Sequence, residues 1–260
     1  MKRGFFMAKI YLVASGKGGV GKTTVCANLG LAYAKDGYKV ILVDGDIGLN
    51  NLDVTLGVED KVCYDIVDVL EGKAKLNQAL ITFDDCKNLK LLPSAKVNVS
   101  ERIKTPMFRR IVDELSTQAD YIFIDAPAGI EYGFHRCAQS AQQAIIVTTP
   151  HISAIKDADR AIATLSTYSM RGIGIVVNRL RQDLVDKGEI LDAESIADLL
   201  RCPLYGVIPE SDKIGIYSLI EGKTRDKAKQ AYYELKENLI NGVMINKRVK
   251  SKGILGRLFG

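Results

Sequence analysis

The residues best suited to chemistry form a glycine-rich loop near the N-terminus. The pattern G-x-x-x-x-G-K-[ST] is matched by Gly16-Lys17-Gly18-Gly19-Val20-Gly21-Lys22-Thr23. Glycines let the backbone wrap closely around a phosphate, and the N–H groups of such a loop converge on that anion as donors. Lys22 can reach the terminal phosphates and the Thr23 hydroxyl can bind Mg²⁺, and we extend the nucleotide contact to Thr24. The loop therefore predicts a nucleotide site.

Two aspartates close apolar runs elsewhere in the chain. Asp44 ends the run VILVD and Asp125 ends the run YIFID. Ligands of open α/β sheets bind beyond the carboxyl ends of the strands, where a carboxylate can hold Mg²⁺ directly or through its waters. We therefore predict a metal site made of Thr23, Asp44 and Asp125.

The elements that must position these groups alternate along the chain. Apolar runs predict strands at 9–15, 39–44, 89–93, 121–126, 144–149, 174–178 and 204–208. Several of these runs are continuously apolar, as expected for strands that are buried on both faces. Helices are predicted at 23–36, 108–116, 153–170 and 226–239. The expected fold is an α/β, mostly parallel, doubly wound P-loop NTPase sheet with helices on both faces.

Composition excludes several other classes of protein. The chain has 260 residues and a net charge of +5, which alone does not indicate a nucleic-acid binder. Its five cysteines are widely spaced without a CxxC pair, so reduced, mostly buried thiols are expected. The N-terminal run MKRGFFMAKIYLVAS has too short an apolar part for a signal peptide and leads directly into the loop. No run reaches the length of a membrane span.

The loop carries a second lysine, Lys17, directly after its first glycine, and here the chain resembles the deviant Walker A ATPases. In that family the extra lysine reaches across a dimer interface to the partner's nucleotide. The resemblance implies this catalytic and dimer-contacting role for Lys17, beside Lys22, and implies that Asp46 orients the attacking water. Judged by residue type alone, a solvated Lys17 and a turn-forming Asp46 are the alternatives.

Three further nucleotide contacts are expected. Gly129, in the run IDAPAGIE, can bring a backbone N–H near the γ-phosphate and let its loop move on hydrolysis. Asn178 resembles the family's adenine-reading asparagine, and Pro209 lies in a segment that resembles the one covering the base. A guanine signature of the NKxD type is absent from the sequence, so ATP is expected rather than GTP.

Within that group the chain most resembles the MinD family of septum-site-determining ATPases. The resemblance rests on KGGVGKTT, VDGDIGLNNLD, IDAPAGIE, VIPES and the tail. It implies a Mg²⁺-dependent ATPase that forms an ATP-dependent homodimer, with Asn51 at the dimer contact. It also implies MinC-like and MinE-like partners at the start of the helix that carries Asp157 and Asp159. A solvated helix face is the equal alternative there.

The C-terminal segment differs in composition from the rest. We predict an ATPase domain over 1–240 and, over 241–260, a basic linker with an amphipathic helix. On a helix, one face of that tail carries Ile254, Leu255, Leu258 and Phe259. Basic residues flank this face, which suits reversible binding to anionic lipids on the inner face of the cell membrane of a cytoplasmic protein. A tail that packs on its own domain, or a disordered basic end, is the alternative.

Three other functions remain open. A flagellar-number regulator of the FlhG type has a similar build, but it predicts a longer N-terminal activation segment. A partition ATPase of the ParA type predicts a basic patch that binds DNA, which the apolar half of the tail argues against. An ATP-using ligase requires a substrate pocket with its own polar residues. The nitrogenase iron protein, another deviant Walker A member, is excluded because the chain offers no convincing pair of cluster cysteines.

Overall fold

A single eight-stranded sheet organises the computed structural model, which describes residues 7–49, 51–95, 103–217 and 226–245. The strand order is β3-β4-β2-β5-β1-β6-β7-β8, and all neighbours pair in parallel except β3 and β4. The strands are β1 (Lys9–Ala14), β2 (Val40–Asp44), β3 (Ile81–Phe83), β4 (Cys86–Leu92), β5 (Tyr121–Asp125), β6 (Gln143–Thr148), β7 (Gly172–Leu180) and β8 (Leu204–Pro209).

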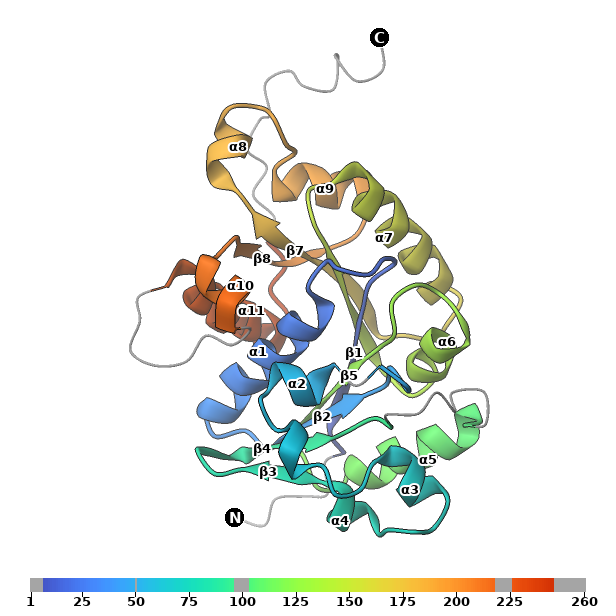
Figure 1. Cartoon of the computed structure of the whole chain (residues 1–260). Coiled ribbons are helices and arrows are strands. Elements are labelled where there is room, and N and C mark those ends of the chain that lie inside the picture. The colour runs from blue at the N-terminus through green and yellow to red at the C-terminus, as the bar shows by residue number, and fades with distance from the viewer. Residues whose placement is uncertain (1–6, 50, 96–102, 218–225, 246–260) are drawn as a thin grey trace.

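Helices cover both faces of this sheet, as Figure 1 shows. They are α1 (Lys22–Lys35), α2 (Leu52–Thr55), α3 (Ile66–Leu70), α4 (Leu76–Ala79), α5 (Thr105–Leu115), α6 (Tyr132–Ala138), α7 (Ile152–Leu165), α8 (Gln182–Asp186), α9 (Ala193–Leu200), α10 (Asp212–Tyr217) and α11 (Lys227–Asn241), with a 3₁₀ turn at Glu59–Lys61. Alternate residues of each strand point to opposite faces. In β1, Tyr11 and Val13 therefore pack with α1 and α11, while Ile10 and Leu12 pack with α5, α6 and α7.

The expected fold class is confirmed, and all seven predicted strands are present with ends shifted by a few residues at most. The strand that the sequence analysis missed is β3, a three-residue edge strand that is antiparallel and only partly buried. The helix predicted at 153–170 was too long, since α7 ends at Leu165. The hydroxyls of Ser166 and Thr167 donate back to the carbonyls of Ile162 and Thr164, and such local bonds compete with helix continuation.

The last described helix is fastened to the sheet and to α1. The buried ammonium group of Lys236 pairs with the carboxylate of Asp36, at the C-terminal end of α1. Asn238 donates its side-chain amide to the Tyr205 carbonyl at 2.9 Å, and the Ile245 amide donates to the Leu204 carbonyl at 3.0 Å. The chain therefore remains bonded to the sheet as far as Ile245. The predicted membrane helix around 254–259 lies outside the described residues.

Two expectations about composition can be compared with the structure. All five cysteines are free thiols, and Cys26, Cys137 and Cys202 are buried. Over the described ranges, no helix is long and apolar enough to cross a membrane.

Substitution of Phe123 tests how much the packing of the central strands contributes to the stability of the fold. Its ring is fully buried on β5 and stacks on Tyr11 with 5.5 Å between centroids. We expect Phe123→Ala to lower the free energy of unfolding by about 3–5 kcal/mol, because it removes buried apolar surface and leaves a cavity. The half-exposed aromatic Tyr64 is the control: Tyr64→Ala should change stability by about 0.5 kcal/mol or less. Urea unfolding measures the free energy of unfolding of both variants. Equal decreases in the two variants would contradict the structural importance of Phe123.

Candidate functional site

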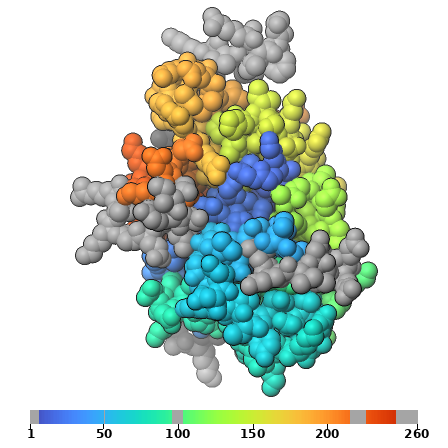
Figure 2. Space-filling view, in the orientation of Figure 1, coloured from blue at the N-terminus to red at the C-terminus, as the bar shows by residue number. Residues whose placement is uncertain are grey.

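The glycine-rich loop joins the carboxyl end of β1 to the first turn of α1. Gly21 adopts a left-handed conformation (φ 85°) and is the residue before the helix, and Gly19 has φ 80°. These angles favour glycine, and they aim the free N–H groups of α1 at the space above the loop, where a helix N-terminus attracts anions. Figure 2 shows the blue N-terminal part of the chain at the middle of this face, between the yellow-green of α7 and the lighter blue of α2.

Gly16 is required by a contact with a helix as well as by the loop. A Cβ atom at this position would lie 1.8 Å from the carbonyl oxygen of Asp157 and 2.2 Å from its carbonyl carbon. Both atoms belong to the backbone of α7, so a side chain here cannot be accommodated by rotating another side chain. The start of the phosphate loop therefore packs directly on α7.

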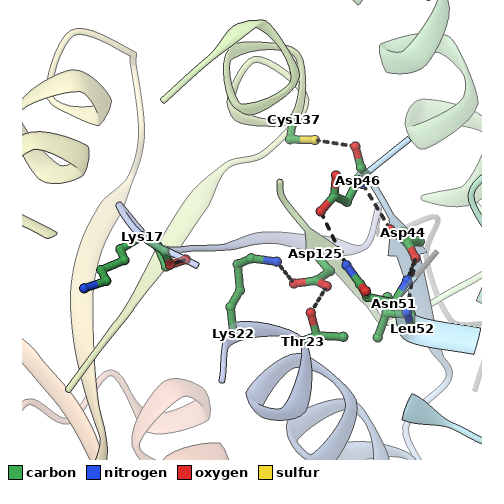
Figure 3. Close-up of polar contacts among 11 residues, drawn as sticks. Lys17, Lys22, Thr23, Asp44, Asp46, Asn51, Leu52, Asp125 and Cys137 are labelled. Carbon is green, nitrogen blue, oxygen red and sulfur yellow. Dashed lines mark hydrogen bonds and ion pairs between the residues drawn. The ribbon is translucent and has the colours of Figure 1, made fainter. Parts of the chain in front are cut away.

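Lys22, Thr23 and Asp125 meet at the mouth of the loop (Figure 3). The Lys22 ammonium lies 2.8 Å from Asp125 Oδ1, and the Thr23 hydroxyl donates to Asp125 Oδ2 at 2.7 Å. Asp125 is completely buried and Lys22 almost so. Burial is the largest single effect on Lys22 and lowers its pKa, but the charge and hydrogen bond of Asp125, with smaller effects of Cys26 and Asp46, together raise the pKa, so Lys22 stays protonated. The predicted Walker residues are therefore assembled around one carboxylate.

Asp44 lies beside Asp125, because the two are register partners at the ends of neighbouring strands β2 and β5. Its carboxylate accepts from the backbone amides of Asp46 at 3.0 Å, Asn51 at 3.1 Å and Leu52 at 3.2 Å. Burial, with the charge of Asp125, nevertheless raises the pKa of Asp44 to about 7. Asp44 thus shapes the loop after β2 and holds its negative charge at an electrostatic cost.

Asp46 and Asn51 lie on the outer side of this loop. The Asn51 side-chain amide lies 3.5 Å from Asp46 Oδ2, and Asn51 is exposed. Burial raises the pKa of Asp46 and Lys22 opposes that effect. The Asp46 carbonyl also accepts from the Ser94 hydroxyl at 3.1 Å, a support that the sequence analysis did not identify.

The residues present fit a magnesium ion. Mg²⁺ prefers oxygen ligands and keeps several waters, so one or two carboxylates and a hydroxyl are sufficient when phosphate oxygens complete the shell. Thr23, Asp44 and Asp125 bring such oxygens together at one edge of the sheet. Among the described residues there is no cluster of three or more His, Cys, Asp or Glu side chains able to hold a metal alone. The donor set of Thr23, Asp44 and Asp125 suits a cation whose shell is completed by phosphate oxygens and water.

Two predicted phosphate contacts have other partners in this structure. The Lys17 ammonium donates to Ser153 Oγ on α7 at 3.1 Å and points away from Lys22 (Figure 3). The Gly129 amide donates to the Ser15 carbonyl at 3.2 Å. Contact of either group with a phosphate thus requires it to exchange its partner, and both roles stay predictions.

A cavity of about 460 Å³ lies beside the loop, and the predicted base-binding residues Asn178 and Pro209 are the sequence neighbours of two of its lining residues, Arg179 and Glu210. Its lining comprises Lys17, Gly18, Gly19, Val20, Thr149, Pro150, His151, Ser153, Ala154, Arg179 and Glu210. Asn178 donates its amide to the Val20 carbonyl at 2.8 Å and so supports the loop, while Pro209 ends β8 just before Glu210. The sequence analysis missed Arg179, whose left-handed backbone (φ 55°) accompanies an irregular stretch of the β7–β8 pairing. No sequence signal marks such a distortion.

The predicted partner face lies on the outer side of α7. Asp159 is exposed, while Asp157 is half-buried and lies 3.7 Å from Arg160. These carboxylates are accessible to a binding protein and are separate from Asp44, Asp46 and Asp125.

Comparison with known proteins agrees with this geometry. The ParA family model, described as an NUBPL iron-transfer P-loop NTPase, matches residues 7–193. The septum site-determining protein MinD of a Synechocystis species is 46% identical over 208 residues, which cover 80% of this chain and 78% of that protein. MinD from Pyrococcus horikoshii, solved with Mg-ADP, superposes with a TM-score of 0.80 at 33% identity and covers 94% of this chain and 100% of its own. The Aquifex aeolicus MinC:MinD complex gives 0.82 at 39% identity, with 93% and 99% covered.

Asp44 makes a testable contribution to pH dependence. Its pKa rises from an ordinary 3.8 to about 7 in the fold, so between these values the folded protein keeps a proton that the unfolded chain has lost. Stability without nucleotide and Mg²⁺ must then fall as pH rises, by up to about 1.4 kcal/mol per pH unit from this group. Urea unfolding at pH 5, 6 and 7 gives the free energy of unfolding at each pH. Its decrease with rising pH should be smaller for Asp44→Asn than for the wild type. The exposed Asp60→Asn should keep the wild-type slope, and identical slopes in all three would contradict the prediction.

Proposed function

The chain belongs to the MinD family of septum-site-determining P-loop ATPases, and from that premise we propose an ATP-dependent switch that attaches to the membrane as a dimer and positions the division septum. The observation that carries this proposal is the joint bonding of Lys22 and Thr23 to the buried Asp125, with Asp44 in register beside it. This is the arrangement that phosphoryl transfer requires, because such catalysis depends mainly on positioning and on neutralising charge.

Each residue contributes a separate part of the proposed hydrolysis. The loop amides and Lys22 hold the β- and γ-phosphates of ATP, and Lys22 offsets negative charge as it develops. Bound Mg²⁺ supplies further charge neutralisation and a fixed geometry for the phosphates. Asp46, at the exposed side of the site, orients the attacking water. Arg179 and Glu210 line the cavity that is proposed to take the nucleoside, and Asn178 supports the loop beside it.

Features around the site support dimerisation through this face. Large apolar side chains stand exposed beside it, with Leu49 at 69%, Val54 at 62% and Ile152 at 60% of their surfaces accessible. Asn51 is exposed between Leu49 and Val54, and the Lys17 ammonium donates to the hydroxyl of Ser153. Exposed apolar groups near a polar site mark interaction surfaces. In the proposed dimer Lys17 releases Ser153 and reaches the partner's nucleotide.

In this proposal, the C-terminal tail couples dimerisation to membrane binding. Full burial of one apolar side chain contributes roughly 1.5–3 kcal/mol and each nearby basic residue about 1 kcal/mol at an anionic surface. Ordering the backbone costs about 1–2 kcal/mol per residue, which leaves one tail marginal. Two linked tails gain avidity of roughly 10²–10⁴. ATP binding would therefore attach the protein to lipid, and hydrolysis would release it.

We also propose two partner proteins for this chain. The Aquifex aeolicus structure contains MinC with MinD, so we propose a MinC-like partner for this chain. A MinE-like protein that stimulates hydrolysis is the second proposed partner. The accessible carboxylates Asp157 and Asp159 on α7 are the proposed contacts.

Lys22→Ala tests the nucleotide site. Loss of a buried, charge-assisted contact should weaken the affinity for Mg-ATP by roughly 100-fold or more. Titration calorimetry with a slowly hydrolysed ATP analogue measures this, and Lys39→Ala, at an exposed lysine, is the control with unchanged affinity. Undiminished affinity in Lys22→Ala would remove the basis of the proposal.

Sedimentation with anionic vesicles tests the switch. We expect the full chain to pellet with ATP but not with ADP, because only the dimer presents two tails. A chain ending at Lys247 should stay in the supernatant with either nucleotide, and neutral vesicles serve as the control. Equal pelleting in both nucleotides would contradict the switch, and binding to DNA in place of lipid would favour the partition function.

A further inference from the structure

Arg136, on α6, is a fully buried cation to which the sequence analysis gave no role. Its Nη2 donates to the Gly45 carbonyl at 3.3 Å and its Nη1 to the Ile103 carbonyl at 3.4 Å. The guanidinium also lies 5.5 Å from the ring centre of Phe108 and 5.8 Å from that of Tyr132. A buried charge is costly unless its partners are well placed, so these contacts define a fixed position for the group.

Gly45, whose carbonyl Arg136 holds, lies in sequence between the predicted metal ligand Asp44 and Asp46, which is predicted to orient the water. Its N–H donates to the Asp125 backbone carbonyl at 2.9 Å, and its C=O also lies 4.0 Å from Cys137 Sγ. A Cβ at Gly45 would lie 2.5 Å from that sulfur and 2.9 Å from the Asp125 carbonyl. The peptide is therefore clamped between β5 and α6.

Asp46 follows directly from this clamped peptide. Its amide donates to Asp44 and its carbonyl accepts from Ser94, so its backbone is held on two further sides. A guanidinium that fixes the preceding carbonyl thus helps to set the direction in which the Asp46 side chain leaves the backbone.

We propose that Arg136 is a positioning residue for ATP hydrolysis, which holds the Gly45 carbonyl so that Asp46 faces the attacking water. The inference rests on the proposed function, in which Asp46 orients that water. It also joins the loop after β2 to the helix that follows the 126–131 loop. A movement of α6 is then passed to Asp46 through one hydrogen bond.

Arg136→Met is the principal variant, because it keeps length and removes the donors. The single-turnover rate constant of hydrolysis should fall roughly 10- to 100-fold, while the affinity for Mg-ADP stays within about twofold. Arg136→Lys retains the charge and one donor direction and should restore part of the rate. The control is Phe134→Leu, on the same helix and equally buried, whose side chain has no polar atom to bond Gly45. It should lower the melting temperature without lowering the rate.

A double-variant cycle separates positioning from general destabilisation. In an Asp46→Asn background, Arg136→Met should change the single-turnover rate by less than about twofold, because the two residues act as one unit. A similar fold-loss in both backgrounds would overturn the proposal. Hydrogen exchange of a peptide spanning 44–49, without nucleotide, gives a readout independent of activity. It should speed up in Arg136→Met and Arg136→Lys relative to Phe134→Leu, and unchanged exchange would equally count against it.

The experiments distinguish a failure of the proposed role of Asp46 from a failure of the proposed role of Arg136. If Asp46→Asn hydrolyses ATP at the wild-type rate, the role of Asp46 is wrong, whatever Arg136 does. If Asp46→Asn is impaired while Arg136→Met is not, Asp46 keeps its role and the positioning role of Arg136 is rejected.

Discussion

A buried ion pair between Lys22 and Asp125 is the interaction on which the rest of the site depends. Asp125 is completely buried at the end of a central strand, and Lys22 begins the helix that follows the phosphate loop. A carboxylate buried alone is strongly unfavourable, so the lysine must approach it from the adjoining loop. The parallel arrangement makes this possible, because β1, β2 and β5 all end at the same edge of the sheet.

More negative charge lies at this edge of the sheet than Lys22 alone can neutralise. Asp44 and Asp46 both have raised pKa values there, chiefly because of burial, and Asp125 adds to each shift. The protein without nucleotide therefore holds carboxylates close together at a cost in stability. A divalent cation relieves that cost, which explains how the binding of a metal nucleotide can stabilise the loops around it.

Much of this could be predicted from sequence, and the exceptions have physical reasons. The strands were recognisable because strands buried on both faces are continuously apolar, and the loop was recognisable because phosphate binding imposes fixed glycines. Asp44 and Asp125 could be placed together because each closes such a strand. Arg136 was not predictable, because an arginine on a short helix is usually exposed and only the tertiary structure buries it. Ser94 and Arg179 were missed for the same reason, since their roles depend on backbone positions far away in the sequence.

The packing of Gly16 on the Asp157 backbone has a mechanical consequence. A backbone-to-backbone contact without an intervening side chain is stiff, because no rotamer change can absorb a displacement. The separation between α7 and the first residue of the phosphate loop is therefore set by two backbones, and any residue larger than glycine at position 16 would force them apart.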